Sequence, residues 1–438
     1  MKTLKTVEVN KNSDYEVIVF GGGPSGCAAA ISSAREGAKT LLIESTYALG
    51  GMSTNGLVSW APIYNGVDFV YGSIAYELIS EAHKVVTYQP ELTSWLKNFY
   101  EETKLMFDRK VIESGVEVLF GSTACAATQE NGNISSVLVS NKNGLTEYTA
   151  KVYIDCTGDA DLVYFAGLGY EKSDYLQPST LCCMMNNVSS EEMNKNRLRI
   201  RSGRRLNWLQ QSIANDPEFD LLDDAHLCCG PNIDNTVSFN AGHIFNVDGT
   251  NPEQVTKAMI QGRKMSLQLR DAMKKYLPDI FSDAAVVQTA SVLGVRESRR
   301  AICDYTLTLE DYLERRTFPD EIGRNCYNVD VHASKEEMEK FGKDTLYENN
   351  YQYDKGESHG IPLRSLIVKG VDNLLVAGRT ISSDHLMMAS IRVMPCCMVT
   401  GEAAGLTAAL ASKKNSGLRA VDCNDVRSIL FKRGAYIK

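Results

Sequence analysis

The sequence lacks any C-x-x-C motif, although it contains 12 cysteines among its 438 residues. This absence excludes zinc-ribbon and thioredoxin-type sites, which need two cysteines at that spacing. Three pairs of adjacent cysteines begin at Cys182, Cys228 and Cys396, and this arrangement serves neither site. We interpret the cysteines as reduced thiols that act mainly as small core residues.

An excess of positive charge is also absent. The chain has 46 Lys and Arg against 54 Asp and Glu, a formal net charge of -8. This charge repels nucleic acid and anionic lipid, and no basic stripe interleaved with aromatic residues is present. We expect no nucleic-acid partner, and an anionic ligand has to be bound by local positive charge.

The first 20 residues lack a secretory signal, since they have no apolar run of signal length and no small-residue cleavage pattern. The most apolar stretch, residues 393–411, is interrupted by Pro395, Thr400, Glu402 and two glycines. These interruptions favour a buried helix over a membrane span. We therefore expect a cytoplasmic protein with no membrane span.

Histidines are few, six in all. His83, His226, His243 and His332 are far apart in the sequence and show neither an H-x-x-x-H pattern nor a carboxylate at ligand spacing. No Ser-His-Asp or Cys-His arrangement is recognisable. The sequence predicts no metal site and no hydrolase-type nucleophile.

The composition that remains is typical of a globular enzyme, with 44% hydrophobic, 23% charged and 8% aromatic residues. At roughly 100 to 200 residues per domain, the length indicates about two or three domains. A chain of this size buries enough surface to hold a large ligand site.

A strand, a glycine turn, a helix and a second strand follow one another over residues 16–44. Gly21, Gly23 and Gly26 match the G-x-G-x-x-G pattern directly after the first strand, and Glu44 closes the second strand 18 residues later. The glycines allow a tight turn, close approach of a pyrophosphate and close packing of the helix. A carboxylate at Glu44 accepts hydrogen bonds from ribose hydroxyls, so we predict a dinucleotide site that disfavours NADP.

Downstream, residues 69–113 have helical spacing, and residues 116–155 read as short strands with Asn-Gly turns, an antiparallel meander. Residues 176–355 are more polar and include the long helical pattern PEQVTKAMIQGRKMSLQLRDAMKKYL. From residue 373 the chain returns to a strand and then a small-residue helix over 395–411, the same order as at the N-terminus. A first domain interrupted by a second explains this order.

These motifs resemble the FAD-dependent oxidoreductases of the FAD_oxidored type, within the glutathione-reductase-like flavoprotein group. The motifs are VIVFGGGPSGCAAAISSAREGAKTLLIE, GGMSTNG, IDCTGDADL, GVRESRR, IPLRSLI and NLLVAGRTISSDH, followed by SIRVMPCCMVTGEAAGLTAALA. The resemblance implies an α/β fold, with a Rossmann-like FAD-binding domain of parallel sheet and antiparallel β-meander and an inserted α+β substrate domain. The expected bounds are 14–175 and 356–412 for the discontinuous FAD-binding domain, 176–355 for the substrate or cap domain and 413–438 for a C-terminal extension.

The resemblance also implies extended FAD and assigns residues to its parts. One set holds the pyrophosphate, adenosine ribose, diphosphate and ribityl groups: Gly21, Gly22, Gly23, Pro24, Ser25, Gly26, Glu44, Ser45, Gly50, Gly51, Met52 and Ser53. The rest lie along the adenine, the ribityl chain and the flavin pyrimidine: Ala124, Cys125, Thr157, Gly158, Asp161, Gly378, Arg379, Met394, Pro395, Cys396 and Cys397. Arg379 stands where the wider group has an acidic residue.

Four cationic side chains are the candidates for the substrate side: His385, Arg392, Arg364 and Arg296. The region of His385 and Arg392 loosely resembles succinate dehydrogenase and fumarate reductase flavoproteins, which place a His and an Arg against a substrate carboxylate. The alternatives are structural: Arg392 pairs a flavin phosphate or a carboxylate, and His385 caps a turn. Arg296 belongs to an ion-paired face with Arg299, and Arg364 to a turn fixed by Pro362.

No second G-x-G-x-x-G follows a strand, and no cysteine pair follows the first βαβ unit at disulfide-reductase spacing, since the segment after Glu44 has no cysteine before Cys125. Both absences disfavour a disulfide reductase. We expect an FAD-dependent oxidoreductase that moves hydride between flavin N5 and a small polar or anionic substrate, with an unidentified electron donor or acceptor. The alternatives are a flavoprotein with structural or non-redox FAD, such as an isomerase, and an NAD-binding protein without flavin. Homo-oligomer formation is left open.

Overall fold

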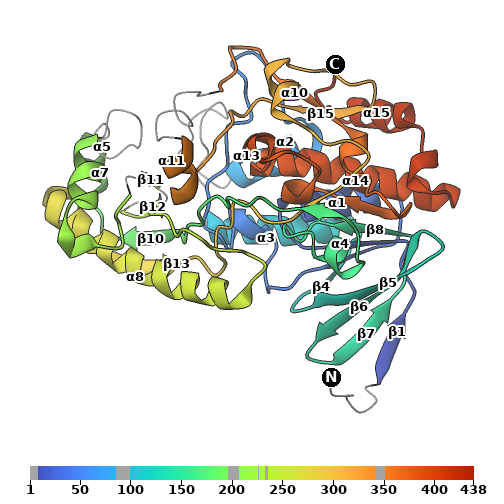
Figure 1. Cartoon of the computed structure of the whole chain (residues 1–438), viewed down its shortest axis with the longest axis horizontal. Helices are drawn as coiled ribbons and strands as arrows, with labels where there is room; N and C mark the ends of the chain where they lie inside the picture. Colours follow the sequence, from blue (N-terminus) through green and yellow to red (C-terminus); the bar gives the residue numbers. More distant parts are fainter. Residues whose placement is uncertain (1–7, 85–98, 196–206, 225, 232–234, 342–350) are drawn as a thin grey trace.

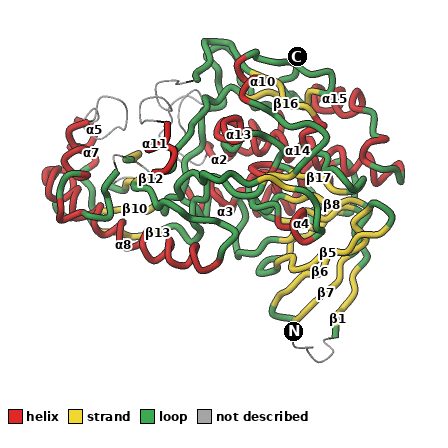
Figure 2. Tube along the Cα trace, in the orientation of Figure 1, coloured by secondary structure: helices red, strands yellow, loops and turns green. Residues whose placement is uncertain are grey.

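A computed structural model describes residues 8–84, 99–195, 207–224, 226–231, 235–341 and 351–438. Three larger sheets and two short strand pairs organise these residues. In Figure 1 the five-stranded sheet lies to the right of centre, the sheet built mainly from residues 123–148 lies at the lower right, and the third sheet lies at the left with its long helix. Figure 2 shows that loops, as well as helices, connect the third sheet to the other two sheets.

The central sheet is parallel, with the strand order β17-β8-β2-β3-β4. Its strands are short and apolar, and β2, β3 and β8 are buried along their whole length, as expected where both faces of a parallel sheet are covered. The bounds are β2 Val17–Phe20, β3 Thr40–Ile43, β4 Glu117–Leu119, β8 Val152–Asp155 and β17 Leu374–Val376. With α1 (Pro24–Arg35), β2 and β3 confirm the predicted βαβ unit.

The long helix α14 (Met394–Lys414) packs closely on α1. Glycines make this approach feasible: a Cβ at Gly401 would lie 2.1 Å from the Ser25 carbonyl oxygen, and one at Gly405 would lie 2.0 Å from that of Ala29. By length and composition alone α14 is apolar enough to cross a membrane, yet 94% of its most apolar stretch is buried inside the protein. The two ends of the chain thus build one core.

The meander prediction holds only for its centre. The antiparallel strands β5 (Thr123–Glu130), β6 (Asn133–Asn141) and β7 (Gly144–Tyr148) are joined by β1 (Val9–Asn12), which pairs parallel to β7. Asn131 and Gly132 both have positive φ, 51° and 75°, which confirms the predicted Asn-Gly turn between β5 and β6. The outer segments β4 and β8 pair with strands of the parallel sheet instead, and the fully buried side chains of β8 fit its place between β17 and β2.

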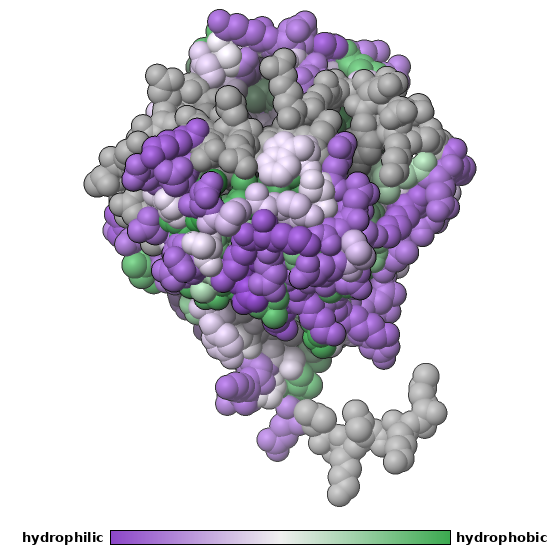
Figure 3. Space-filling model, turned by 90° about the vertical axis from the view of Figure 1, so that its left-hand side faces the viewer, coloured by the Kyte–Doolittle hydropathy of each residue, from purple (hydrophilic) through white to green (hydrophobic). Residues whose placement is uncertain are grey.

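The third sheet has the order β11-β12-β10-β13 and is antiparallel. Its strands are β10 Cys183–Asn186, β11 Leu227–Pro231, β12 Val237–Ala241 and β13 Ala285–Thr289. The long helix α8 (Pro252–Tyr276), as predicted, packs beside it and buries Met265 and Leu269. The outer face of this part is mainly hydrophilic (Figure 3).

Two hydrophobic cores divide the described residues. The second core contains buried residues between Leu181 and Leu293, together with Leu57 and Tyr100. The first core contains the parallel sheet and also buried residues from Ala301 to Val329. The chain therefore rejoins the first core before residue 355, the expected end of the substrate domain. The stretch after residue 412 also packs on the first core, through Leu418 and Leu430.

The remaining elements connect these parts. The helices are α2 Ser73–Lys84, α3 Tyr100–Glu113, α4 Asp161–Phe165, α5 Ser190–Lys195, α7 Asn207–Ala214, α9 Pro278–Phe281, α10 Leu309–Leu313, α11 Lys335–Phe341, α13 His385–Ile391 and α15 Cys423–Lys432. The strand pairs are β9 (Tyr170–Glu171) with β14 (Arg300–Ala301), and β15 (Glu321–Asn325) with β16 (His359–Pro362). Short 3-10 turns are η1 Gly51–Ser53, η2 Pro217–Phe219, η3 Leu363–Ser365, η4 Gly378–Thr380 and η5 Leu418–Ala420.

Candidate functional site

A cavity of about 480 Å³ lies where the two cores meet. One part of its wall comes from the parallel sheet, at the turn after β2, the end of β3 and residues 156–161. The other part comes from residues 292–296 and 327–332. The carboxyl ends of parallel strands and the junction of two packed units are the usual places for a ligand, so this cavity is the candidate site.

The glycine turn shapes the cavity as predicted. Gly21 has a φ of 95°, and a Cβ at Gly26 would lie 1.7 Å from the Gly21 carbonyl oxygen, so α1 starts directly against the strand. A Cβ at Gly23 would meet nothing within 4 Å, because this residue faces the open cavity. The turn therefore offers its backbone to a ligand.

Two helices begin at the cavity wall without side-chain caps. Gly23 precedes α1 and Val393 precedes α14, and neither helix has a capping hydrogen bond from a side chain. The first N–H groups of a helix have no partner within the helix and carry partial positive charge. Both helix ends thus provide sites for negative charge in the same cavity.

Glu44 lies in the wall with its carboxylate fixed from two sides. Oε2 accepts a hydrogen bond from the Gly22 N–H at 2.6 Å, and Oε1 accepts one from the Thr46 N–H at 2.6 Å. The residue is 8% exposed. Each carboxylate oxygen keeps acceptor capacity for a ligand hydroxyl.

Most residues proposed for the cofactor line the cavity: Gly21, Gly23, Pro24, Ser25, Glu44, Ser45, Gly51, Met52, Ala124, Thr157, Gly158, Asp161, Arg379, Met394 and Cys397. The others do not line it: Gly22, Gly26, Gly50, Ser53, Cys125, Gly378, Pro395 and Cys396. Cys125 lies at an irregularity of the β5–β6 pairing, and its thiol donates to the Leu138 carbonyl at 3.4 Å.

Arg379 lines the cavity but is held by protein groups. Its guanidinium pairs with Asp159 at 2.9 Å and donates to Ser298 Oγ at 3.1 Å. Asp161, also in the wall, pairs with Arg299 at 2.5 Å. Burial, followed by the neighbouring carboxylates Asp155 and Asp159, raises the pKa of Asp161 to about 7.

Arg296 and Arg392 meet in the wall contributed by the second part of the cavity. Arg296 donates to the Pro178 carbonyl at 2.5 Å and to Thr180 Oγ1 at 2.9 Å, and burial and then the charge of Arg392 lower its pKa to about 10. Arg392 donates to the Asp330 carbonyl at 2.9 Å, and its buried Nε has no hydrogen-bond partner. Two cationic groups therefore line the ligand space, and one of them, Arg392, keeps a buried donor without a partner.

His385 is not in this wall, which corrects the expectation that it faces a substrate. Nδ1 lies 2.9 Å from Glu297 Oε2 and Nε2 lies 3.1 Å from Glu337 Oε1. Burial lowers the pKa of His385, but the two carboxylates outweigh burial and raise it to about 9. At neutral pH the imidazole is a charged partner of two acidic groups.

Arg364 is also outside the wall, and this prediction is corrected in the same way. Its Nε lies 2.9 Å from Asp320 Oδ2, and its side chain is about half exposed. The alternative holds here, since Arg364 has a structural ion pair beside the turn that follows Pro362.

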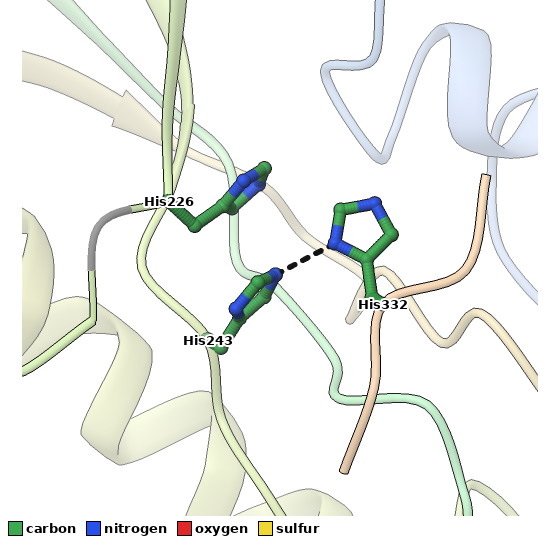
Figure 4. Close-up of side chains that lie close together, drawn as sticks. All are labelled: His226, His243 and His332. Atoms are coloured by element: carbon green, nitrogen blue, oxygen red, sulfur yellow. Dashed lines mark hydrogen bonds between the residues drawn. The ribbon is translucent and has the colours of Figure 1, made fainter. Parts of the chain in front are cut away.

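Sequence reasoning missed a histidine cluster. The nitrogens of His226, His243 and His332 lie within 4.8 Å of one another, so these residues are not scattered in space (Figure 4). His226 and His243 flank the β11–β12 hairpin, and the Gly242 N–H donates to the His226 carbonyl at 2.8 Å. Recognising that hairpin in the sequence would have indicated the pair.

The model of the FAD dependent oxidoreductase family, FAD_oxidored, matches residues 16–430. The chain belongs to this family. FAD is therefore its cofactor, which confirms that prediction and sets aside the NAD-binding alternative. The N–H groups of the glycine turn, the fixed Glu44 carboxylate and the two uncapped helices fit the phosphate, ribose and flavin groups of FAD.

Curated relatives of this flavoprotein match it only in part. The digeranylgeranylglycerophospholipid reductase of Thermoplasma acidophilum is 27% identical over 169 residues, 35% of this chain and 42% of that protein. The mitochondrial dihydrolipoyl dehydrogenase of Schizosaccharomyces pombe is 26% identical over 163 residues, 36% of this chain and 30% of that protein. The matched region thus spans less than half of each relative's length.

Solved structures align over most of this flavoprotein at low identity. The anhydrotetracycline hydroxylase OxyS of Streptomyces rimosus aligns with a TM-score of 0.49 at 12% identity, over 95% of this chain and 65% of that one. A geranylgeranyl bacteriochlorophyll reductase-like protein of Thermoplasma acidophilum aligns with a TM-score of 0.45 at 12% identity, over 98% of this chain and 93% of that one.

Proposed function

We propose that this FAD-dependent oxidoreductase transfers hydride between flavin N5 and a small anionic substrate that Arg296 and Arg392 bind. The observation that carries the proposal is the position of the two guanidinium groups in the cavity wall, with one buried donor, Arg392 Nε, left without a partner. A carboxylate satisfies such a donor with a strong charge-assisted hydrogen bond.

Protein contacts hold both arginines before a substrate arrives. The Pro178 carbonyl and Thr180 fix Arg296, and the Asp330 carbonyl fixes Arg392. Because their freedom is already restricted, binding costs less conformational entropy and the substrate is oriented more sharply. FAD supplies the hydride donor or acceptor when it is bound.

Charge and proton movements have candidates in the same wall. The N-terminus of α14 stabilises negative charge that develops in the cavity. Tyr327 takes over the proton-carrying role expected of His385, because it lines the cavity and burial holds its pKa well above the ordinary value. A hydroxyl that stays protonated at neutral pH is a proton donor.

An anaerobic screen of small mono- and dicarboxylates against the purified holoprotein tests the proposal, with bleaching of the oxidised flavin band as the readout. The Arg392→Gln variant should keep FAD and weaken the apparent affinity for the reducing substrate by about 10²-fold. The matched control is Arg364→Gln, which removes an arginine outside the cavity and should leave that affinity unchanged.

Two results would contradict this function. A flavin that no carboxylate reduces, while a redox-neutral conversion of a substrate proceeds, favours the structural or non-redox FAD. Equal affinity of Arg392→Gln and the parent protein for the reducing substrate would show that Arg392 does not bind the anion. The proposal also includes an electron partner, which steady-state turnover with quinone, oxygen or nicotinamide acceptors identifies. Reduction of the flavin by a dicarboxylate in the screen would support the likeness to succinate dehydrogenase and fumarate reductase flavoproteins.

A further inference from the structure

Three imidazole rings converge beside the flavin cavity. His243 Nε2 lies 2.8 Å from His332 Nδ1, and the rings of His226 and His243 stack with centroids 4.2 Å apart and planes within 3° of parallel. Figure 4 shows that His226 and His243 come from neighbouring segments, while His332 reaches them from a segment distant in sequence. His332 itself lines the cavity.

Carboxylates fix two of these rings from behind. His243 Nδ1 makes a close ion pair with Asp224, and His332 Nε2 lies 3.5 Å from Asp330 Oδ2. A ring nitrogen that donates to a carboxylate carries the hydrogen, which leaves the lone pair on the opposite nitrogen. The lone pairs of His243 Nε2 and His332 Nδ1 then face each other, and a cation between them relieves their repulsion.

His226 completes the group without a short hydrogen bond at Nε2. That nitrogen lies 3.4 Å from Arg296 Nη2 and 3.4 Å from Asn240 Oδ1, both at the limit of hydrogen-bonding distance. The Arg296 guanidinium can only donate to a lone pair on Nε2, and at 3.4 Å this contact is weak enough for a stronger partner to replace it.

We propose that His226, His243 and His332 bind one divalent transition-metal ion at the edge of the flavin cavity. Three imidazoles suit Zn²⁺, Fe²⁺, Ni²⁺ or Cu²⁺ better than Mg²⁺ or Ca²⁺, which prefer oxygen ligands. Tetrahedral coordination at about 2.1 Å separates ligand nitrogens by roughly 3.4 Å, so the 2.8 Å pair has to open only slightly.

The surrounding charges fit this ion and its next ligand. Asp224 and Asp330 lie behind the rings and offset part of the positive charge, although Asp330 is shared with Arg392. Arg296 and Arg392 face it from the cavity side, where Arg392 pairs with Asp330 at 3.6 Å. Three protein ligands leave a coordination position open, and here water or an anionic group fills it. The site stands independently of the proposed hydride transfer.

Metal binding by the FAD-loaded protein tests the site, with Zn²⁺ as the probe. After chelation and dialysis against Zn²⁺, elemental analysis should find about one ion per chain, and Co²⁺ should give d–d bands at wavelengths longer than flavin absorption. The His243→Gln/His332→Gln double variant should lose the bound Zn²⁺. Asp224→Asn should weaken Zn²⁺ binding by about 10- to 100-fold, because it disturbs the orientation of His243.

His83→Gln is the matched control, since His83 is buried elsewhere with Nδ1 on the Ile79 carbonyl at 2.9 Å. It should retain the metal, and the FAD absorbance of each variant shows that it is folded. Absence of stoichiometric Zn²⁺ from the parent protein would overturn the inference in favour of a proton shared between His243 and His332. Full Zn²⁺ binding by the folded double variant would overturn it as well.

Discussion

His385 Nδ1 lies 2.9 Å from Oε2 of Glu297, a carboxylate whose side chain is completely buried. Arg300 contacts the same carboxylate at 2.5 Å, and Glu337 lies on the other side of the imidazole. Removing one charged side chain from this buried cluster leaves an oppositely charged side chain without its partner. The group therefore stabilises the junction between the residues after β13 and helix α13, and this explains why a histidine expected in catalysis is occupied elsewhere.

The stability of the protein should fall on the alkaline side because of His385. Its pKa is about 9 in the folded protein against an ordinary value of 6.5. A raised pKa gives stability that is fully present below the unfolded value and is lost as pH rises through the folded value. Urea denaturation between about pH 6 and pH 10 should show a loss of about 3 kcal/mol from this group. The His385→Gln variant should lack this component, and parallel pH profiles of the two proteins would contradict the assignment.

At neutral pH the His385→Gln variant should be less stable than the parent by about 3 kcal/mol, because Glu297 and Glu337 lose their shared positive partner. Flavin reduction by a substrate found in the screen should proceed within a few-fold of the parent rate at a temperature where the variant is folded. Stopped-flow absorbance measures that rate. A decrease of about 10²-fold in the folded variant would restore the proton-transfer role.

Two substitutions in the glycine turn should have opposite effects. Gly23→Val places its side chain in open cavity space, so the protein should fold but bind FAD at least about 10²-fold more weakly. Gly26→Ala puts a methyl 1.7 Å from a carbonyl oxygen, so it should destabilise the packing of α1 itself. Thermal melts without added FAD, together with FAD fluorescence titrations, separate the two effects. A normal FAD affinity in Gly23→Val would show that the FAD phosphates do not bind at this turn.

Glu44→Gln should weaken FAD binding by about 10-fold, because a neutral amide accepts hydrogen bonds from ribose less strongly than a carboxylate. Glu16→Gln is the control, since Glu16 lies just before β2, does not line the cavity and pairs with Lys151 at 3.0 Å. Titration of the apoprotein with FAD gives both affinities. Equal affinities in the two variants would show that Glu44 only holds the Gly22 and Thr46 N–H groups.

Local patterns in the sequence predicted the part of the site that local geometry determines. The turn from Gly21 to Gly26, the strand end at Glu44 and the Asn131-Gly132 hairpin each follow from residues close together in the chain. The strands that pair with β4 and β8 could not be predicted from the sequence, because a short apolar strand fits a parallel or an antiparallel neighbour equally well. Only the order of the folded sheet decides between them.

Contacts between distant segments were beyond the same reasoning. Glu297 and Glu337 surround His385 only after three separate segments pack together. His226, His243 and His332 have no ligand spacing, yet a hairpin and a loop bring them within reach of one another. Arg296 and Arg392 were predicted near the flavin from the resemblance, and both lie in the cavity wall.

The contact of α14 with α1 also bears on when the holoprotein forms during synthesis. The cavity wall takes residues from the turn after β2 and from the start of α14, at opposite ends of the chain. A nascent polypeptide therefore carries an unfinished cofactor site until α14 has left the ribosome. FAD can therefore be held fully only after α14 has been synthesised, and the yellow colour of the bound flavin marks molecules in which α14 is packed on α1.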